Sequence, residues 1–245
     1  MIKKTLLLLG MLFIIGYLVI AVTAFNVKPS DQVCEDIELV IKDSLNAGFI
    51  TKKEINTLLK KKKINLVGEK MEYIHCDTLE NLLATHPLID EVECYKTPGG
   101  KINIEVTQRV PILRIMPHNG ENYFIDNKGG IMPNDAKCVA NLAIVTGNIE
   151  KAFAMKELYH FGLFLQNNKF WNAQIQQINV LAEKEIEFVP RVGNHIVFMG
   201  KLNNYEEKLN RLKEFYTKGL NTVGWNKYSR INIEFANQII CTKAE

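Results

Sequence analysis

The chain begins with one long apolar segment. In the rest of the chain, apolar and polar residues are interspersed. Residues 5–25 carry no charge and directly follow Lys3 and Lys4. At about 1.5 Å of rise per residue, a helix of this length covers roughly 30 Å, the thickness of the hydrocarbon core of a bilayer. The pattern predicts a transmembrane signal anchor at 5–25 that follows a cytoplasmic tail at 1–4. The rest of the chain then lies on the other side of the membrane from that tail.

A cleavable signal peptide is the alternative for the same segment. The tripeptide Val22-Thr23-Ala24 offers a cleavage site. The apolar run is longer than the roughly 7–15 residues of a signal-peptide core, and no polar region separates it from Ala24. These features favour the anchor, while cleavage after Ala24 stays open.

After a polar linker at 26–33, the pattern becomes that of a strand followed by a helix. Residues 36–41 alternate between polar and apolar, as a half-buried strand does. Thr51 precedes a helical pattern, and Glu54 three residues later completes a capping box. We therefore expect a strand and a first helix in this region.

A second helix and a hairpin follow. The helix begins near Asp77 and ends before Pro87, because proline disfavours the helical conformation in the residue that precedes it. Strands at 88–95 and 101–106 flank a Pro-Gly-Gly turn whose glycines can adopt positive φ. With the preceding elements they predict an α+β domain at 34–110, a three-stranded sheet with two helices on one face.

Residues 111–245 predict a mixed, mostly antiparallel β domain with two flanking helices. Gly219 is expected to end the second of these helices. The last segment forms either two strands around an Ala-Asn-Gln turn or one bent strand. The predicted elements are a hairpin at 123–133, a strand at 142–147, a helix at 150–166, strands at 175–181, 185–189 and 195–199, a helix at 205–218 and the strand-like stretch at 230–241.

The balance of charges argues against a nucleic-acid-binding surface. The chain has 30 basic and 27 acidic residues, a formal net charge of +3, whereas nucleic-acid-binding domains concentrate positive charge on one face. The one dense basic run, at 60–63, closes a helical pattern, where cations suit the helix dipole. A solvated helix end is favoured there over a phosphate or lipid-headgroup contact.

The five cysteines are far apart in the sequence and form no metal-binding pattern. No C-x-x-C pair or suitably spaced histidine accompanies them, so no metal or cofactor is expected. An oxidising compartment would allow one or two disulfides and leave at least one thiol unpaired, whereas burial as small apolar side chains is the default. The cysteines are Cys34, Cys76, Cys94, Cys138 and Cys241.

The sequence contains no catalytic motif. G-x-S-x-G, P-loop, G-x-G-x-x-G and H-E-x-x-H patterns are absent. Asp126 and Asp135 could be paired carboxylates, but Asp126 lies in a predicted turn, where Asp commonly bonds the backbone. The chain is therefore expected not to be an enzyme. The histidines are expected at the surface or at helix ends: His75, His86, His118, His160 and His195.

Motifs surround the hairpin of the first predicted domain. His86-Pro87-Leu88-Ile89 opens the hairpin and Gln108-Arg109-Val110-Pro111 closes it. With the strand-helix-helix-strand-strand order, these residues resemble a POTRA domain (polypeptide-transport-associated), in the version found in the FtsQ/DivIB bacterial cell-division proteins. That family usually closes with Glu-Arg-x-Pro, so Gln108 departs from the motif and Arg109 and Pro111 agree with it.

The second half carries further motifs of the same family. Tyr123-Phe124-Ile125-Asp126 is followed by a polar turn and Ile131-Met132-Pro133, similar to the family signature but widened by one glycine. Residues 142–147 end in Thr-Gly, and the alternating stretch from Tyr228 is similar to the last strands of the FtsQ β domain. The resemblance extends over nearly the whole chain.

The resemblance implies a non-enzymatic, single-pass division scaffold in the bacterial inner membrane. Its folded part would lie in the periplasm or at the cell exterior, enriched at the septum. In the family, the β domain recruits the FtsB/DivIC and FtsL coiled-coil pair, and the POTRA domain contacts other divisome membrane proteins. An extended partner segment lies along the last strand, in agreement with the capacity of a sheet edge to accept a strand.

Six residues are carried over as partner-binding candidates. Phe235 and Ile239 fit a role in the β-domain core equally well. Lys184 is the one candidate for a basic residue that pairs with an acidic partner residue in the family, although glutamates at 183, 185 and 187 surround it. The candidates are Phe235, Asn237, Ile239, Cys241, Tyr228 and Lys184.

Two other functions stay open. A different POTRA-bearing envelope adaptor could chaperone exported chains by strand addition, although the sequence lacks the series of alternating strands, each of about ten residues, that an outer-membrane transporter needs. A secreted hydrolase would require cleavage after Ala24.

Overall fold

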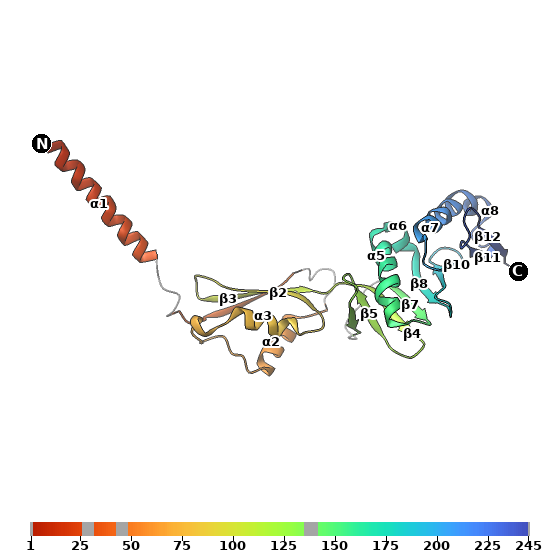
Figure 1. Cartoon of the computed structure of the whole chain (residues 1–245), viewed down its shortest axis with the longest axis horizontal. Helices are drawn as coiled ribbons and strands as arrows, with labels where there is room; N and C mark the ends of the chain where they lie inside the picture. The colour runs from red at the N-terminus through yellow and green to blue at the C-terminus, as the bar shows by residue number, and fades with distance from the viewer. Residues whose placement is uncertain (1, 26–31, 43–48, 135–141, 245) are drawn as a thin grey trace. The chain divides into compact units, whose positions relative to one another are not determined.

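The computed structural model describes residues 2–25, 32–42, 49–134 and 142–244 (Figure 1). The chain divides into two compact units. The first consists of the residues up to Ile41 with 52–84 and 92–106. The second consists of 42–51, 85–91 and 107–245.

Helix α1 (Ile2–Phe25) covers the predicted apolar segment and confirms that this segment is helical. Over the part of the chain that the structure describes, no helix combines the length and the hydropathy that a membrane span requires. Placement of α1 in a membrane stays a prediction.

The three-stranded sheet, strand order β1-β3-β2, and two helices confirm the predicted order of the first α+β region. Alternate residues of β3 are buried, among them Ile102 and Ile104. The helices bury Ile55 and Leu83, so one face of the sheet is covered by their apolar stripes. The elements are β1 (Asp36–Lys42), α2 (Lys52–Lys61), the short turn η2 (Met71–Tyr73), α3 (Cys76–Ala84), β2 (Ile89–Lys96) and β3 (Lys101–Gln108).

The second unit is built on a nine-stranded sheet with the strand order β12-β11-β10-β9-β8-β7-β4-β5-β6. Three neighbouring pairs, β4 with β7, β7 with β8 and β10 with β11, are parallel, and the other described pairs are antiparallel. The prediction of a mixed, mostly antiparallel sheet is confirmed. The strands are β4 (Pro111–Pro117), β5 (Tyr123–Asp126), β6 (Ile131–Pro133), β7 (Ala143–Gly147), β8 (Ile175–Val180), β9 (Ile186–Pro190), β10 (Ile196–Gly200), β11 (Tyr228–Asn232) and β12 (Ile240–Lys243).

Helices cover one face of this sheet and enclose the core between them and the strands (Figure 1). Phe161, Trp171 and Tyr216 of the helices are almost fully buried, as are Phe188 and Val197 of the strands. The helix predicted at 150–166 is confirmed, with a π turn in its middle, and a short helix, α6, was not predicted. The segments are α4 (Lys151–Phe153), η3 (Ala154–Leu158), α5 (Tyr159–Asn167), α6 (Lys169–Gln174), α7 (Tyr205–Glu214), η4 (Phe215–Leu220) and α8 (Asn221–Val223).

The prediction that Gly219 ends the last helix is wrong. The helix continues through Gly219 in the π turn η4 and ends after Val223. Gly224 has φ +96 there, a left-handed conformation that suits a glycine at a helix end. A Cβ on Gly219 would lie 2.8 Å from the Phe215 ring, so this glycine serves close side-chain packing.

The surface position expected for His195 is also wrong. His195 is 1% exposed, and its Nε2 lies 2.9 Å from the hydroxyl of Tyr216. The residue stands directly before β10, and its ring packs against that of Tyr216 rather than in solvent. Burial lowers the pKa of His195.

The two-strand alternative for the carboxy-terminal segment is the correct one. β11 and β12 are separate antiparallel strands, with Ile231 opposite Cys241 and Asn232 opposite Ile240. The Ala-Asn-Gln turn lies between them, and Asn237 has φ +62. Asn tolerates this left-handed conformation better than most residues.

Candidate partner-binding edge

β12 is the outermost strand of the nine-stranded sheet, as the sequence predicted for the carboxy-terminal strand. It pairs with β11 on one side, and no described strand pairs with its other side. Three of its four residues are exposed, including Ile240 at 48%. An edge of this kind presents backbone donors and acceptors to which another extended chain can add.

An arginine from α7 fixes the segment that leads into this edge. Arg211 Nη2 donates hydrogen bonds to the carbonyl oxygens of Ile233 at 3.2 Å and Phe235 at 3.0 Å. The side chain of Asn232 accepts a hydrogen bond from the N–H of Glu234 at 2.9 Å. These contacts hold the backbone between β11 and the turn in one conformation.

A groove of about 460 Å³ lies between the last helix and this turn. Phe215 and Ile239 give it apolar surface, while charged side chains of both signs surround them. Such a groove can bind an apolar side chain of a partner, while its charged residues form ion pairs with charged residues beside that side chain. The lining residues are Arg211, Glu214, Phe215, Lys218, Gly219, Asn237, Gln238 and Ile239.

The structure separates the two candidates that fitted both a core and a surface role. Phe235 is 46% exposed and therefore does not fill the core. Ile239 is half-buried, packs against the core and also lines the groove. Asn237 lines the groove from the turn. Contact of these residues with a partner stays a prediction.

Cys241 and Tyr228 flank the same region from the two paired strands. Cys241 is half-buried against the core, and burial raises the pKa of its thiol. The Tyr228 ring lies 6.2 Å from the Phe215 ring, and the ammonium of Lys227 lies 5.9 Å from its centre. Tyr228 thus connects β11 to the aromatic residue of the groove.

Lys184 is not brought to the edge with the other five candidates. It lies in the turn between β8 and β9, and β10 and β11 separate β9 from β12. Its ammonium pairs with Glu150 at 3.0 Å and lies 5.7 Å from the centre of the Phe153 ring. Glu187 pairs with Arg230 at 3.4 Å instead.

Sequence reasoning missed the residues that α7 and η4 contribute to the groove. Arg211 and Lys218 had no distinguishing pattern, because charged residues are common on the exposed face of an amphipathic helix. Phe215 is half-buried, as a residue at the border of the apolar face of that helix is. Their proximity to the turn depends on how the helix packs, which a single sequence does not reveal.

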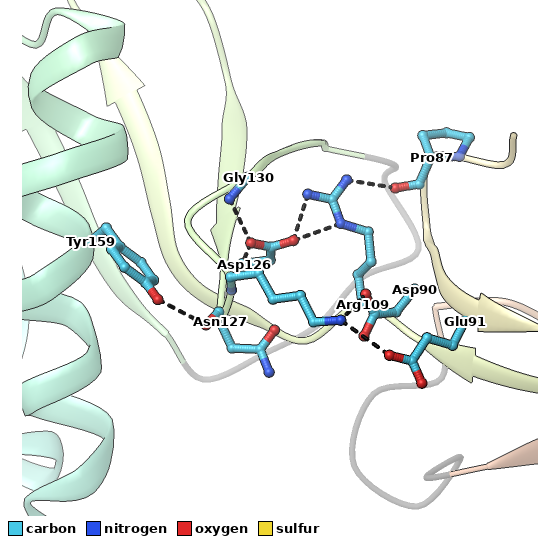
Figure 2. Close-up of polar contacts among 9 residues, drawn as sticks. Pro87, Asp90, Glu91, Arg109, Asp126, Asn127, Gly130 and Tyr159 are labelled. Carbon is cyan, nitrogen blue, oxygen red and sulfur yellow. Dashed lines mark hydrogen bonds and ion pairs between the residues drawn. The ribbon is translucent and has the colours of Figure 1, made fainter. Parts of the chain in front are cut away.

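A second polar cluster joins the closing motif of the first hairpin to the β5–β6 turn (Figure 2). Arg109 donates from Nε to Asp126 Oδ2 at 2.7 Å and from Nη1 to the carbonyl oxygens of Pro87 and Ile131 at 3.0 and 3.1 Å. The other oxygen of Asp126 accepts from the N–H of Gly130 at 2.6 Å. Asp126 is thus a turn-forming residue, as predicted, and Asp135 lies outside the described residues.

A lysine on the same turn contacts the start of β2, the first strand of that hairpin. The ammonium of Lys128 lies 2.8 Å from Asp90 and 3.4 Å from Glu91, and the hydrogen bond with Asp90 raises its pKa. The Tyr159 hydroxyl donates to the carbonyl oxygen of Asn127 at 3.2 Å (Figure 2). Each of these contacts is either a hydrogen bond with the backbone or an ion pair. The cluster therefore stabilises the packing of the β5–β6 turn against the ends of the hairpin.

The described residues contain no group of three or more His, Cys, Asp or Glu side chains placed to hold a metal ion. The edge strand β12 and the groove beside it give this helix-covered sheet backbone groups and a recess to which an extended chain can add.

Two family profiles match the chain. Residues 110–242 match the profile described as FtsQ/DivIB, C-terminal related, and residues 32–107 match a POTRA-like domain. The chain belongs to the FtsQ/DivIB C-terminal related family, which confirms the resemblance drawn from its motifs. No curated protein matches it. These domains support membership in a division-related adaptor family whose members are generally non-catalytic scaffolds.

Proposed function

We propose that this protein is a non-enzymatic, single-pass scaffold of the bacterial division machinery. Its β12 edge recruits a coiled-coil pair of the FtsB/DivIC and FtsL type and links that pair to septal peptidoglycan synthesis. The observation that supports this most is the position of β12, outermost in its sheet and adjacent to a groove.

Strand addition at this edge suits a partner with an extended segment. Main-chain hydrogen bonds to β12 supply affinity and are largely independent of sequence. An apolar partner side chain in the groove near Phe215 and Ile239 then fixes the register, since a shift of one residue turns every side chain to the other face. The exposed Phe235 adds apolar contact area beside the groove.

The proposed location is the inner membrane. The uncharged segment 5–25 behind Lys3 and Lys4 supports an anchor whose amino end stays in the cytoplasm. The POTRA-like and β domains would then lie in the periplasm or at the cell exterior, where the POTRA-like domain contacts other divisome membrane proteins. Enrichment at the septum follows from these contacts.

A proline series along β12 tests strand addition. In an antiparallel strand the N–H groups point alternately to the two sides, so proline at each residue from Ile240 to Lys243 removes donors toward β11 and toward the outer side in turn. The prolines that face β11 should lower the midpoint of thermal unfolding. Those that face outward should leave the midpoint unchanged and prevent co-purification of the coiled-coil pair from membranes.

Alanine at the same outward positions is the matched control, because it keeps the backbone donor and should keep the partner pair. Ile239 is a poor site for proline, since its side chain packs against the core. Recovery of the pair with all four proline variants, each of them folded, would contradict the proposal.

Localisation separates this function from that of another POTRA-bearing envelope adaptor. A fluorescent fusion of a division scaffold should concentrate at midcell during septation. Uniform fluorescence around the envelope, with normal septation after depletion of the protein, would favour the adaptor instead.

A further inference from the structure

Two cysteine thiols meet between a helix and a strand of the first unit. Cys76 is the first residue of α3 and is partly exposed, and Cys94 lies in β2 and is 9% exposed. Both thiols are free, and the neighbouring Cys76 thiol is, after burial, a cause of the raised pKa of Cys94. Neither was singled out by its sequence spacing, because 17 residues separate them.

An independent contact fixes the same helix face against the same strand residue. Glu80 follows Cys76 by four residues, so both side chains lie on one face of α3. The carboxylate of Glu80 accepts a hydrogen bond from the backbone N–H of Cys94 at 2.7 Å. The helix therefore presents Cys76 to Cys94 in a fixed register.

We propose that Cys76 and Cys94 are a disulfide-forming site that links α3 to β2 when the domain is in an oxidising compartment. The bond joins two residues of the same compact unit. It restricts the unfolded chain while leaving the native contacts of Glu80 in place.

The oxidant is the disulfide of a thiol–disulfide oxidoreductase or of a small molecule such as oxidised glutathione. The Cys76 thiolate attacks one oxidant sulfur, which forms a mixed disulfide and releases the other sulfur as a thiolate. The Cys94 thiol loses its proton and attacks Cys76 Sγ, which releases the second oxidant sulfur. The protein loses two protons and two electrons, and the electrons reduce the oxidant disulfide.

The exposure of the two thiols supports this order of attack. Burial raises the pKa of Cys94, so little of its thiol is deprotonated and able to attack an external oxidant. Cys94 therefore reacts second, with the mixed disulfide already formed on Cys76. Cys76 is accessible at the helix surface.

The other described cysteines have different environments. Cys34 is buried and donates from Sγ to the carbonyl oxygen of Asp36 at 3.5 Å. Cys241 belongs to the second unit and packs against its core. Cys138 lies outside the described residues.

Peptide mapping of the purified full-length protein tests the proposal. After incubation with oxidised glutathione and alkylation of free thiols, the tryptic peptide 71–96, which contains both cysteines, should be unalkylated and lighter by two hydrogens. Cleavage at the acidic residues between them should leave two fragments that separate only after reduction. Three alkylated cysteines should remain in the protein.

Serine variants assign the bond. Cys76→Ser and Cys94→Ser should each abolish the protected peptide, whereas Cys34→Ser and Cys241→Ser should retain it. Reduction should lower the midpoint of thermal unfolding of the wild type by several degrees and leave that of Cys76→Ser unchanged.

Alkylation of both cysteines in the oxidised, folded wild type would overturn the proposal, and so would a bond from either of them to Cys138. The wild-type map is decisive even if a serine variant fails to fold. It is also independent of partner binding at β12.

Discussion

One side-chain oxygen of Gln108 holds two backbone amides of a distant segment. Its Oε1 accepts hydrogen bonds from the N–H groups of Phe49 and Ile50, both at 3.0 Å, and the residue is 2% exposed. A carboxylate would supply the same acceptor. Gln108 and the Glu that the family usually has at this position can therefore hold the backbone at Phe49 and Ile50 in the same way.

Replacing Gln108 by leucine should destabilise the protein. Gln108→Leu leaves two buried N–H groups without an acceptor, and each costs about 1–3 kcal/mol, so the free energy of unfolding should fall by roughly 2–6 kcal/mol. Gln108→Glu keeps the acceptor and should cost less. Denaturant titration of both variants measures the difference, and equal losses would show that these hydrogen bonds are not responsible.

His195 should make stability depend on pH. Burial holds its folded pKa below the ordinary value of 6.5. Below about pH 6.5 the unfolded chain therefore binds a proton that the folded protein does not, and the free energy of unfolding falls as the pH drops. Above that pH the residue contributes no pH dependence.

Urea titrations between pH 7.5 and about pH 5 measure the effect of His195. His195→Gln keeps a polar partner for the Tyr216 hydroxyl and should reduce the slope of stability against pH. His118→Gln, at an exposed position, is the control and should keep the wild-type slope. An unchanged slope in His195→Gln would assign the pH dependence to other groups.

At the scale of elements, hydrophobic periodicity located most helices and strands because each buries one face. It did not give the order of strands in the sheet, where β10 pairs in parallel with β11 and β7 lies between β4 and β8. These pairings join segments distant in sequence. Lys184 shows the consequence, since the strand order places its turn away from the β12 edge, where it pairs with Glu150. Its contact with a partner stays a prediction.

The candidate site was predictable only in part for the same reason. The terminal position of the last strand suggested an edge, and alternation identified Phe235 and Ile239 as apolar positions. The pattern could not tell which of them faces solvent, because both lie in the turn between β11 and β12. There the side chains no longer alternate between the two faces of the sheet. The half of the groove that comes from α7 and η4 depends on helix packing.

Arg211 should control the order of the segment between β11 and the turn. Arg211→Ala removes the donors to the carbonyl oxygens of Ile233 and Phe235. We expect faster hydrogen exchange of the amides at 234–239 and weaker binding of the coiled-coil pair, with global stability lowered by about 1–2 kcal/mol.

Hydrogen exchange followed by mass spectrometry measures this local change. Arg211→Lys keeps the charge but lacks the planar group that reaches both carbonyls, so it should give an intermediate effect. Lys213→Ala, on the exposed part of α7, is the control and should leave exchange at 234–239 unchanged. Wild-type protection in Arg211→Ala would show that the turn is ordered by other contacts.

At the scale of the whole molecule, the proposed scaffold needs its folded part to stay close to the membrane. The linker at 26–33 has eight residues, which span at most roughly 30 Å when fully extended. An anchored form would therefore keep the POTRA-like domain near the bilayer and concentrate the β12 edge where membrane-bound partners are found. A released form would have the same edge but would lose this effective concentration.

Exchanging residues 1–25 for a cleavable signal peptide separates anchoring from binding. The released protein should fold and bind the coiled-coil pair in solution, yet fail to restore septation in depleted cells, because tethering raises the local concentration of the edge. An unrelated single-pass segment of the same length should restore septation.

Amino-terminal sequencing verifies release in the first variant and shows whether the wild type is cut after Ala24. Full septation with the released form would contradict the tether role, and cleavage of the functional wild-type protein after Ala24 would remove the anchor from the mechanism.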